Sequence, residues 1–219
     1  MKIGTDGVLL GAWATIQNEN SSILDIGAGT GLLSLMLAQR SLAENIEALE
    51  IDEEAYEQCV ENFEASPWAD RLFCYHAGLD EFIEELAEPF DLIISNPPFY
   101  SEAVTSGNTS RDTARQNQSL PFDELLEGVS KLLSPDGLFT TIVPFKEEQA
   151  FVRLAASFGL FPNRILRVKG NSSAEVKRSL LEFGFKESDV SEDELTIEIK
   201  RHEYTEQYIE LTKEFYLKM

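Results

Sequence analysis

Four consecutive residues, Asn96-Pro97-Pro98-Phe99, follow the apolar run at 90–94 and carry groups that can do chemistry. Two prolines stiffen the backbone and remove two N–H donors, so the carbonyls stay free to face a ligand. Asn96 offers a side-chain carbonyl, Pro97 a backbone carbonyl and Phe99 a flat apolar face. Two acceptors and a ring suit a planar group that carries an NH2. The simpler alternative is a rigid turn that ends a buried strand.

A glycine-rich loop earlier in the chain offers a place for a cofactor. Gly27, Gly29 and Gly31 follow the apolar run at 22–26, and glycines let the backbone approach a ligand where a Cβ would clash. The dinucleotide fingerprint needs its third glycine at the position of Leu32. The spacing therefore favours a nucleoside without a pyrophosphate over a nicotinamide dinucleotide, with a glycine turn that binds nothing as the alternative.

Glu50 is a second indication of a nucleoside site. It follows Gly31 by 19 residues and lies at the expected end of the next strand, where a carboxylate can accept hydrogen bonds from both ribose hydroxyls. One acidic residue among 39 would mean little by itself. Its position relative to Asp25 and the glycine loop makes it a candidate cofactor ligand.

The elements that must position these groups alternate between strands and helices. Apolar runs predict strands, and apolar or amphipathic stretches predict helices. The expected strands are 22–26, 46–51, 72–75, 90–94, 138–143, 160–168, 178–185 and 195–200. The expected helices are 8–13, 32–38, 53–64, 79–86, 122–133, 146–157 and 204–217. This alternation predicts a parallel sheet, and the consecutive strands near the C-terminal end predict at least one antiparallel strand.

Two further segments have a polar character. Residues 101–118 form a long polar stretch, which favours a lid or substrate loop over a structural connection, with plain surface disorder as the alternative. Residues 134–137, Ser-Pro-Asp-Gly, are a turn signal. Neither segment separates two domains, so we expect a single domain over residues 1–219.

Composition limits the classes of function. The 43% hydrophobic and 26% charged residues are those of an ordinary globular protein. Two cysteines and two histidines without metal-ligand spacing lead us to expect neither a disulfide framework nor a metal site. No apolar run approaches the roughly 20 residues that span a bilayer, and residues 1–6 lack the core of a signal peptide. We therefore expect a cytoplasmic protein with no membrane partner.

The net charge of −21 argues at first against a polyanionic partner, because Lys and Arg supply much of the affinity for phosphates. The charge is uneven, since residues 1–95 hold three basic and 19 acidic side chains. Between residues 153 and 178, Glu175 alone accompanies six basic side chains: Arg153, Arg164, Arg167, Lys169, Lys177 and Arg178. A local basic patch stays compatible with RNA, with an ordinary solvated face as the alternative.

Together, the segments 25–31 and 96–99 and Glu50 resemble the class I S-adenosylmethionine-dependent methyltransferases that act on exocyclic amino or amide nitrogens. A finer resemblance is to the bacterial tRNA1(Val) (adenine(37)-N6)-methyltransferase family. It covers nearly the whole chain and is carried by residues 1–13, 67–69, 114–115, 204–206 and 215–217. The opening block at 1–13 is its most specific part.

The resemblance implies an α/β, Rossmann-like fold with a seven-stranded, mostly parallel sheet, an antiparallel last strand and helices on both faces. It also implies a monomer that uses S-adenosylmethionine, releases S-adenosylhomocysteine and methylates N6 of an adenine in tRNA. The cofactor site would comprise Asp25, Gly27, Gly29, Gly31, Glu50, Ile51, Asp80 and Asn96. Asn96, Pro97 and Phe99 would be catalytic, and the RNA would meet Pro98, Arg111, Arg115, Arg164 and Lys169.

The chain departs from the family pattern in two places. Relatives usually carry a strand-forming segment before the opening block, so residues 1–20 are expected to be a shortened N-terminal cap. Many relatives also have an acidic residue after the third strand, where this chain has Gly78. Either Asp80 takes over the bond to the cofactor adenine, or backbone and packing hold that ring.

The same loop would serve an amide nitrogen equally well. A methyltransferase for protein glutamine, or for another RNA or DNA amino group, is therefore an alternative. A nucleotide-binding module without catalysis and a nicotinamide dehydrogenase are alternatives of other classes. The missing third glycine argues against the dehydrogenase, and the intact Asn96 and Pro97 argue against an inactive scaffold.

Overall fold

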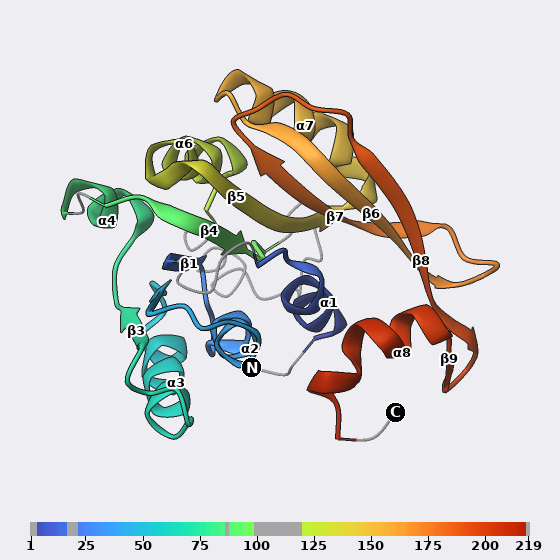
Figure 1. Cartoon of the computed structure of the whole chain (residues 1–219), viewed down its shortest axis with the longest axis horizontal. Coiled ribbons are helices and arrows are strands. Elements are labelled where there is room, and N and C mark those ends of the chain that lie inside the picture. Colours follow the sequence, from blue (N-terminus) through green and yellow to red (C-terminus); the bar gives the residue numbers. More distant parts are fainter. Residues whose placement is uncertain (1–3, 17–21, 86–87, 99–119, 218–219) are drawn as a thin grey trace, which may run out of the picture.

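The computed structural model describes residues 4–16, 22–85, 88–98 and 120–217. Within these residues, nine strands form one sheet in the order β3-β2-β1-β4-β5-β7-β6-β8-β9 (Figure 1). The strands are β1 (Ser22–Ile26), β2 (Asn45–Leu49), β3 (Leu72–Tyr75), β4 (Phe90–Ser95), β5 (Leu133–Pro144), β6 (Phe161–Asn171), β7 (Val176–Gly184), β8 (Ser191–Lys200) and β9 (Glu203–Tyr204).

The described helices lie between these strands or beside them. They are α1 (Thr5–Trp13), α2 (Leu32–Arg40), α3 (Glu53–Glu64), α4 (Leu79–Glu85), α6 (Phe122–Leu132), α7 (Glu148–Ser157) and α8 (Glu206–Thr212), with 3-10 turns η1 (Phe145–Glu147) and η2 (Lys213–Phe215). No helix of the described ranges is long and apolar enough to cross a membrane.

The direction of the strands confirms the expected fold class. β1 to β5 run parallel to one another, whereas β7 is antiparallel to both β5 and β6. The antiparallel strand thus lies between two strands that precede it in the chain. β8 pairs parallel with β6, and β9 pairs antiparallel with β8. These two strands extend the sheet beyond the seven that the family resemblance implies.

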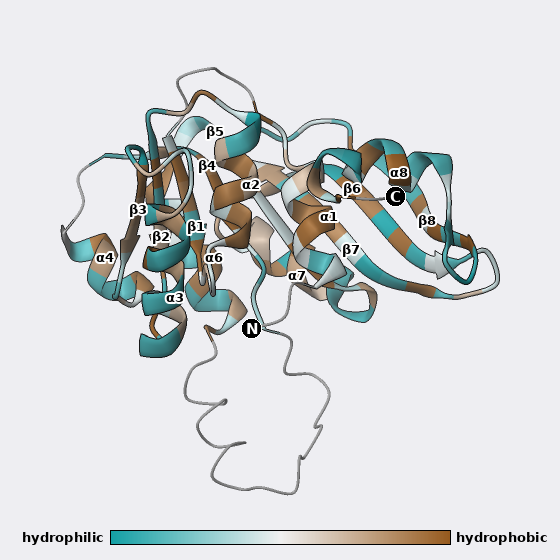
Figure 2. Ribbon diagram, turned by 90° about the horizontal axis from the view of Figure 1, so that it is seen from below, coloured by the Kyte–Doolittle hydropathy of each residue, from teal (hydrophilic) through white to brown (hydrophobic). Residues whose placement is uncertain are grey.

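Two core layers sandwich the sheet because successive strand residues point to opposite faces. On β4, Leu92 and Ile94 join one cluster and Ile93 joins the other. Helices α1, α2, α3 and α8 contribute to the first cluster, and α4, α6 and α7 to the second. In Figure 2 the strands are rich in hydrophobic residues, whereas α3 is largely hydrophilic on its visible side. Helices on both faces are therefore confirmed.

Most expected elements differ from the structure by a few residues at their ends, and two differ more clearly. The helix expected at 204–217 is shorter, because Tyr204 belongs to β9 and Thr205 caps α8 by accepting from the Tyr208 N–H at 3.2 Å. The turn expected at 134–137 lies inside β5 as a bulge. The pairing with β4 moves only from Phe90 to Leu92 while β5 moves from Leu133 to Leu138, so the four turn residues loop out of the ladder.

Candidate active site

Three neighbouring strands deliver the candidate residues to one edge of the sheet. The last residue of β1, Ile26, pairs with Leu49 of β2 and with Ser95 of β4. The glycine loop, Glu50 and Asn96 therefore all follow adjacent strand ends. The chain order reverses between β1 and β4, and such switch points are where open α/β sheets bind ligands.

The glycine loop is tied to β2 and open on its other side. The Gly27 and Ala28 N–H groups both donate to the Leu49 carbonyl at 2.9 Å. Gly27, Gly29 and Gly31 have φ values of 74°, 59° and 80°, which other residues rarely adopt. A Cβ on Gly27 would meet nothing within 4 Å. The loop thus forms a cradle with room for a ligand against its backbone.

Glu50 fixes the shape of this cradle. Its Oε2 accepts from the Gly29 N–H at 2.7 Å, and its Oε1 accepts from the Asp52 N–H at 2.8 Å. Only 9% of the residue is exposed. A carboxylate has about four acceptor positions, so it can hold the loop and still accept from two hydroxyls. The adjacent Ile51 is 46% exposed and offers apolar surface at the rim.

Asp25 lies fully buried beneath the loop. Its Oδ2 accepts from the Ser34 N–H at 3.1 Å and from the Ser34 hydroxyl at 2.7 Å, which fixes the start of α2. Its Oδ1 has no hydrogen-bond partner in the described part of the chain. Burial raises the pKa of Asp25 to about 7, against the lowering effect of the Ser34 hydrogen bonds. The carboxyl is therefore a buried group with an unused acceptor at the base of the cradle.

The Asn96–Pro98 segment stands beside this cradle. Asn96 is half-buried, Pro97 is buried and Pro98 is exposed, whereas Phe99 lies outside the described residues. The Ser95 hydroxyl donates to the Ile26 carbonyl at 2.8 Å and joins the segment to β1. The Asn96 amide and the glycine loop are thus anchored to the same strand end.

Helix α1 forms a wall of the site that sequence reasoning did not place there. A Cβ on Gly7 would lie 3.1 Å from Leu32 Cδ2 and 3.8 Å from Asn96 Nδ2. In Figure 1 the carboxyl end of β4 points toward α1. Only a residue without a side chain fits this contact without displacing Leu32. Gly7 belongs to the opening block at 1–13. Only its membership of that block could have indicated from the sequence that it lies near the site.

Asp80, an expected cofactor residue, follows β3 at the start of α4 and is exposed. A Cβ on Gly78 would lie only 2.6 Å from Asp80 Oδ1, so Gly78 leaves room for this carboxylate. The Gly78 N–H donates to Glu81 Oε2 at 3.1 Å. Gly78 and Asp80 thus lie side by side where the chain enters α4 after β3.

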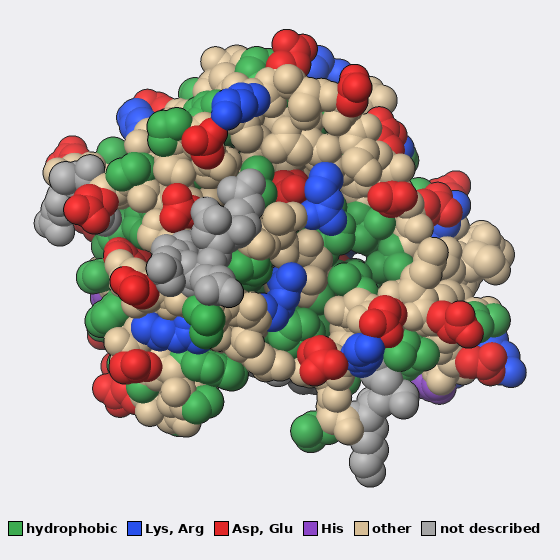
Figure 3. All heavy atoms as spheres, in the orientation of Figure 1, with side chains coloured by type: hydrophobic (Ala, Val, Ile, Leu, Met, Phe, Trp, Pro, Cys, Tyr) green, Lys and Arg blue, Asp and Glu red, His purple; other side chains and the backbone are tan. Residues whose placement is uncertain are grey.

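Four of the six basic side chains of residues 153–178 are paired with carboxylates. Arg164 pairs with the buried Glu182 at 3.2 Å and lies over the Trp13 ring at 4.3 Å. Lys169 pairs with Glu194 at 2.8 Å. Two more basic residues of this segment are paired, Arg167 with Glu148 and Arg178 with Asp6. Figure 3 shows blue and red side chains interspersed on the visible face.

Of the expected RNA-binding residues, Pro98 lies beside the cradle, whereas Arg164 and Lys169 lie on a more distant strand. β6, which carries Arg164 and Lys169, is separated from β4 by β5 and β7. Arg111 and Arg115 lie outside the described residues. The glycine loop, Glu50, Ile51, Asp25 and Asn96, by contrast, meet at one edge of the sheet as expected.

Comparison with known proteins decides the family. Residues 7–159 match the methyltransferase small domain family. The tRNA1(Val) (adenine(37)-N6)-methyltransferase of Flavobacterium johnsoniae is 61% identical, over 100% of this chain and 94% of that protein. The enzyme of the same name from Pseudoalteromonas translucida is 41% identical, over 100% of this chain and 93% of that protein. The chain belongs to this methyltransferase family.

Solved structures of other methyltransferases have the same fold as this chain. A predicted O-methyltransferase from Agrobacterium tumefaciens superposes with a TM-score of 0.74 at 18% identity, covering 95% of this chain and 96% of its own. A TehB-like methyltransferase from Corynebacterium glutamicum gives 0.55 at 16% identity, covering 84% and 89%. At such low identities these likenesses establish the Rossmann-like fold and no more.

The two ends of the glycine loop make a matched pair for mutation. A Cβ on Gly31 would lie 2.5 Å from Phe63 Cε1 and 2.9 Å from Cys59 Sγ, whereas one on Gly27 would touch nothing. We expect Gly27→Ala to cost about 1–2 kcal/mol of unfolding free energy from backbone strain alone. Gly31→Ala should cost about 1–3 kcal/mol more because of overpacking. Urea unfolding of both variants checks this, and equal losses would contradict the described packing.

The raised pKa of Asp25 gives a second prediction. Because folding raises this pKa from 3.8 to about 7, the carboxyl's contribution to stability is complete below pH 3.8 and is lost as the pH rises through about 7. Asp25→Asn keeps an acceptor for Ser34 and cannot ionise. Relative to wild type, this variant should therefore gain stability as the pH rises, by a few kcal/mol. Urea unfolding of both cofactor-free proteins between about pH 5 and about pH 8 measures the difference. A pH-independent difference would show that Asp25 does not titrate in this range.

Proposed function

We propose that this chain transfers a methyl group from S-adenosylmethionine to N6 of an adenine in tRNA. The named activity of its relatives makes A37 of tRNA1(Val) the expected target. The observation that carries the proposal is the meeting of the glycine loop, Glu50 and Asn96 at adjacent strand ends, in a chain 61% identical to an enzyme of that name. We further propose that the protein acts in the cytoplasm as a monomer.

The residues of the cradle fit this cofactor. Gly27 leaves the backbone open, and the buried Asp25 has an unused acceptor for the methionine end. We assign the ribose hydroxyls to Glu50, apolar contact with the adenine ring to Ile51 and the adenine amine to Asp80. When bound, S-adenosylmethionine supplies an electrophilic methyl group on a sulfonium and leaves as S-adenosylhomocysteine.

Asn96 and Pro97 position the substrate nitrogen for methyl transfer. The lone pair of an adenine N6 is delocalised into the ring, so this nitrogen is a poor nucleophile. When the Asn96 side-chain carbonyl and the Pro97 carbonyl accept its two N–H bonds, the nitrogen is drawn toward tetrahedral geometry and its lone pair is aimed. Positioning of this kind can contribute about 7–11 kcal/mol to a reaction. The methylated nitrogen then loses one of its two N–H protons to solvent, so the proposed mechanism gives no role to a histidine or another general base.

The base itself must leave its stack to reach the clamp. We propose that Phe99 stacks on the extruded adenine, a contact worth about 1–3 kcal/mol, and that the exposed Pro98 borders it. We assign the phosphate contacts to Arg111 and Arg115. Arg164 and Lys169 are weaker candidates than we first expected, because each already pairs with a carboxylate.

Substitutions at Asn96 and Glu50 should separate catalysis from cofactor binding. We expect Asn96→Ala to lower kcat by at least about 100-fold, in line with the loss of one preorganised catalytic hydrogen bond, while the affinity for S-adenosylhomocysteine changes little. Asn96→Asp keeps side-chain acceptors and should retain more activity than Asn96→Ala. Glu50→Ala should weaken S-adenosylhomocysteine binding by about 10-fold or more, as calorimetry can measure. If Asn96→Ala removed both activity and binding, the segment would be structural.

Labelling identifies the substrate class directly. The protein is incubated with labelled S-adenosylmethionine and either total tRNA or a protein extract, followed by nucleoside and amino-acid analysis. Label in N6-methyladenosine is the expected result. Label in protein alone would replace this proposal with amide methylation, which the acidic surface would tolerate more readily than RNA.

A further inference from the structure

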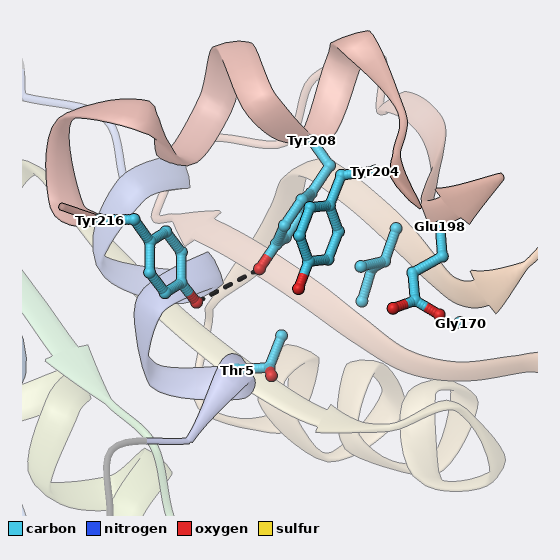
Figure 4. Close-up of a pocket in the computed structure, with 7 residues that line it drawn as sticks. Thr5, Gly170, Glu198, Tyr204, Tyr208 and Tyr216 are labelled. Atoms are coloured by element: carbon cyan, nitrogen blue, oxygen red, sulfur yellow. Dashed lines mark hydrogen bonds between the residues drawn. The ribbon is translucent and has the colours of Figure 1, made fainter. Parts of the chain in front are cut away.

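A pocket lined by tyrosines opens where α1, β6, β8 and the C-terminal segment meet (Figure 4). Tyr204 ends β9, Tyr208 lies in α8 and Tyr216 follows η2. The pocket has a volume of about 300 Å³, at the lower end of the range for small-molecule sites. Methyl transfer as described above uses none of these residues, so the pocket needs its own explanation.

Aromatic faces and hydroxyl groups dominate the lining. The rings of Tyr204 and Tyr208 lie 5.2 Å apart at 38° to each other. The hydroxyls of Tyr208 and Tyr216 form a hydrogen bond of 3.2 Å, and Figure 4 shows all three hydroxyls turned toward the side where Thr5 lies. Burial raises the pKa of Tyr208, so its hydroxyl stays protonated. The pocket thus offers ring surface together with neutral hydrogen-bonding groups.

Glu198 gives the pocket its charge. Its Oε1 accepts from the His202 N–H at 3.2 Å, which leaves further acceptor positions on the carboxylate. No Lys or Arg stands among the described lining residues. A phosphate or another anion would be repelled here. A neutral, planar ring with N–H donors matches both the tyrosines and the carboxylate.

The pocket is close to the methyl-transfer clamp. Thr5 lines the pocket, and Gly7, two residues further along α1, lies against the Asn96 amide. Residues two apart on a helix point to nearly opposite sides, so the pocket and the clamp flank the first turn of α1, separated by about the 10 Å diameter of the helix. An RNA strand that delivers one base to Asn96 and crosses the start of α1 reaches the tyrosines.

We propose that the tyrosine pocket binds a second base of the RNA, from a nucleotide near the target adenine. The assignment rests on the proposed function. Single-stranded RNA is recognised through unstacked bases that lie on aromatic rings and are hydrogen-bonded at their edges, and the acidic wall selects bases over phosphates. The pocket can therefore hold the substrate strand although Arg164 and Lys169 are already paired with carboxylates.

Gly170 allows the pocket to be filled without removing any side chain. The register places it opposite Ile197, between the pairs Lys169–Thr196 and Asn171–Glu198, and both residues line the pocket. A Cβ on Gly170 would meet nothing within 4 Å. Gly170→Leu should therefore occupy the pocket while the fold stays intact, and Gly170→Ala is the matched small change.

The test measures binding and turnover separately. A fluorescein-labelled RNA hairpin with the target adenine in its loop is titrated in the presence of S-adenosylhomocysteine. We expect Gly170→Leu to raise the RNA Kd and the KM for tRNA by about tenfold, the size of one lost base stack. Gly170→Ala should stay within about twofold of wild type by the same criterion. The affinity for S-adenosylhomocysteine and the Tm should be unchanged in both.

Tyr204→Leu is the second variant and removes a stacking face. Its control is Phe215→Leu, which changes an aromatic of the same C-terminal segment that packs on α1 and does not line the pocket. Weaker RNA binding by Tyr204→Leu alone supports the proposal. Wild-type RNA affinity in folded Gly170→Leu and Tyr204→Leu proteins overturns it. If wild type methylates no RNA, the proposed function fails, and a Gly170→Leu effect on RNA binding would still support the pocket.

Discussion

The carboxylate of Glu50 is the interaction on which the cradle depends. It accepts from two backbone N–H groups, one in the glycine loop and one at the start of α3. Charged acceptors make stronger hydrogen bonds than neutral ones, and partial burial strengthens them further. A residue that would bind ribose therefore also holds the loop that would bind the rest of the cofactor. The same Glu50 carboxylate would bind the ligand and already holds the loop, so the site is preorganised before any ligand binds.

The second half of the site is built from long-range contacts. Trp13 and Thr15, at and just beyond the end of α1, contact Arg164, which pairs in turn with Glu182. At the other end of α1, Asp6 pairs with Arg178. The wall beside Asn96 is thus fastened to β6 and β7. Two residues of the basic stretch, Arg164 and Arg178, therefore serve to hold α1 in place.

Much of the cradle could be predicted from short patterns. The run 22–26 is a strand with the expected bounds, and the glycines, Glu50 and Asn96 follow strand ends because local sequence encodes such turns. Partners across the fold could not be predicted in the same way. No local pattern predicts that Arg164 pairs with Glu182. None predicts that Gly7 lies near Asn96 either. The bulge at 134–137 was likewise hidden, because a turn signal and a strand bulge use the same residues.

The pair between Asp6 and Arg178 also bears on how the protein is made. The two residues are 172 positions apart, and Arg178 lies in β7, which enters the sheet between two strands that are synthesised earlier. Contacts of such large sequence separation form late, because loop closure must precede them. During translation the glycine loop and Asn96 can fold long before α1 is fastened over them. The growing chain can therefore assemble the glycine-loop cradle first and fasten α1 beside it only after β7 has been synthesised.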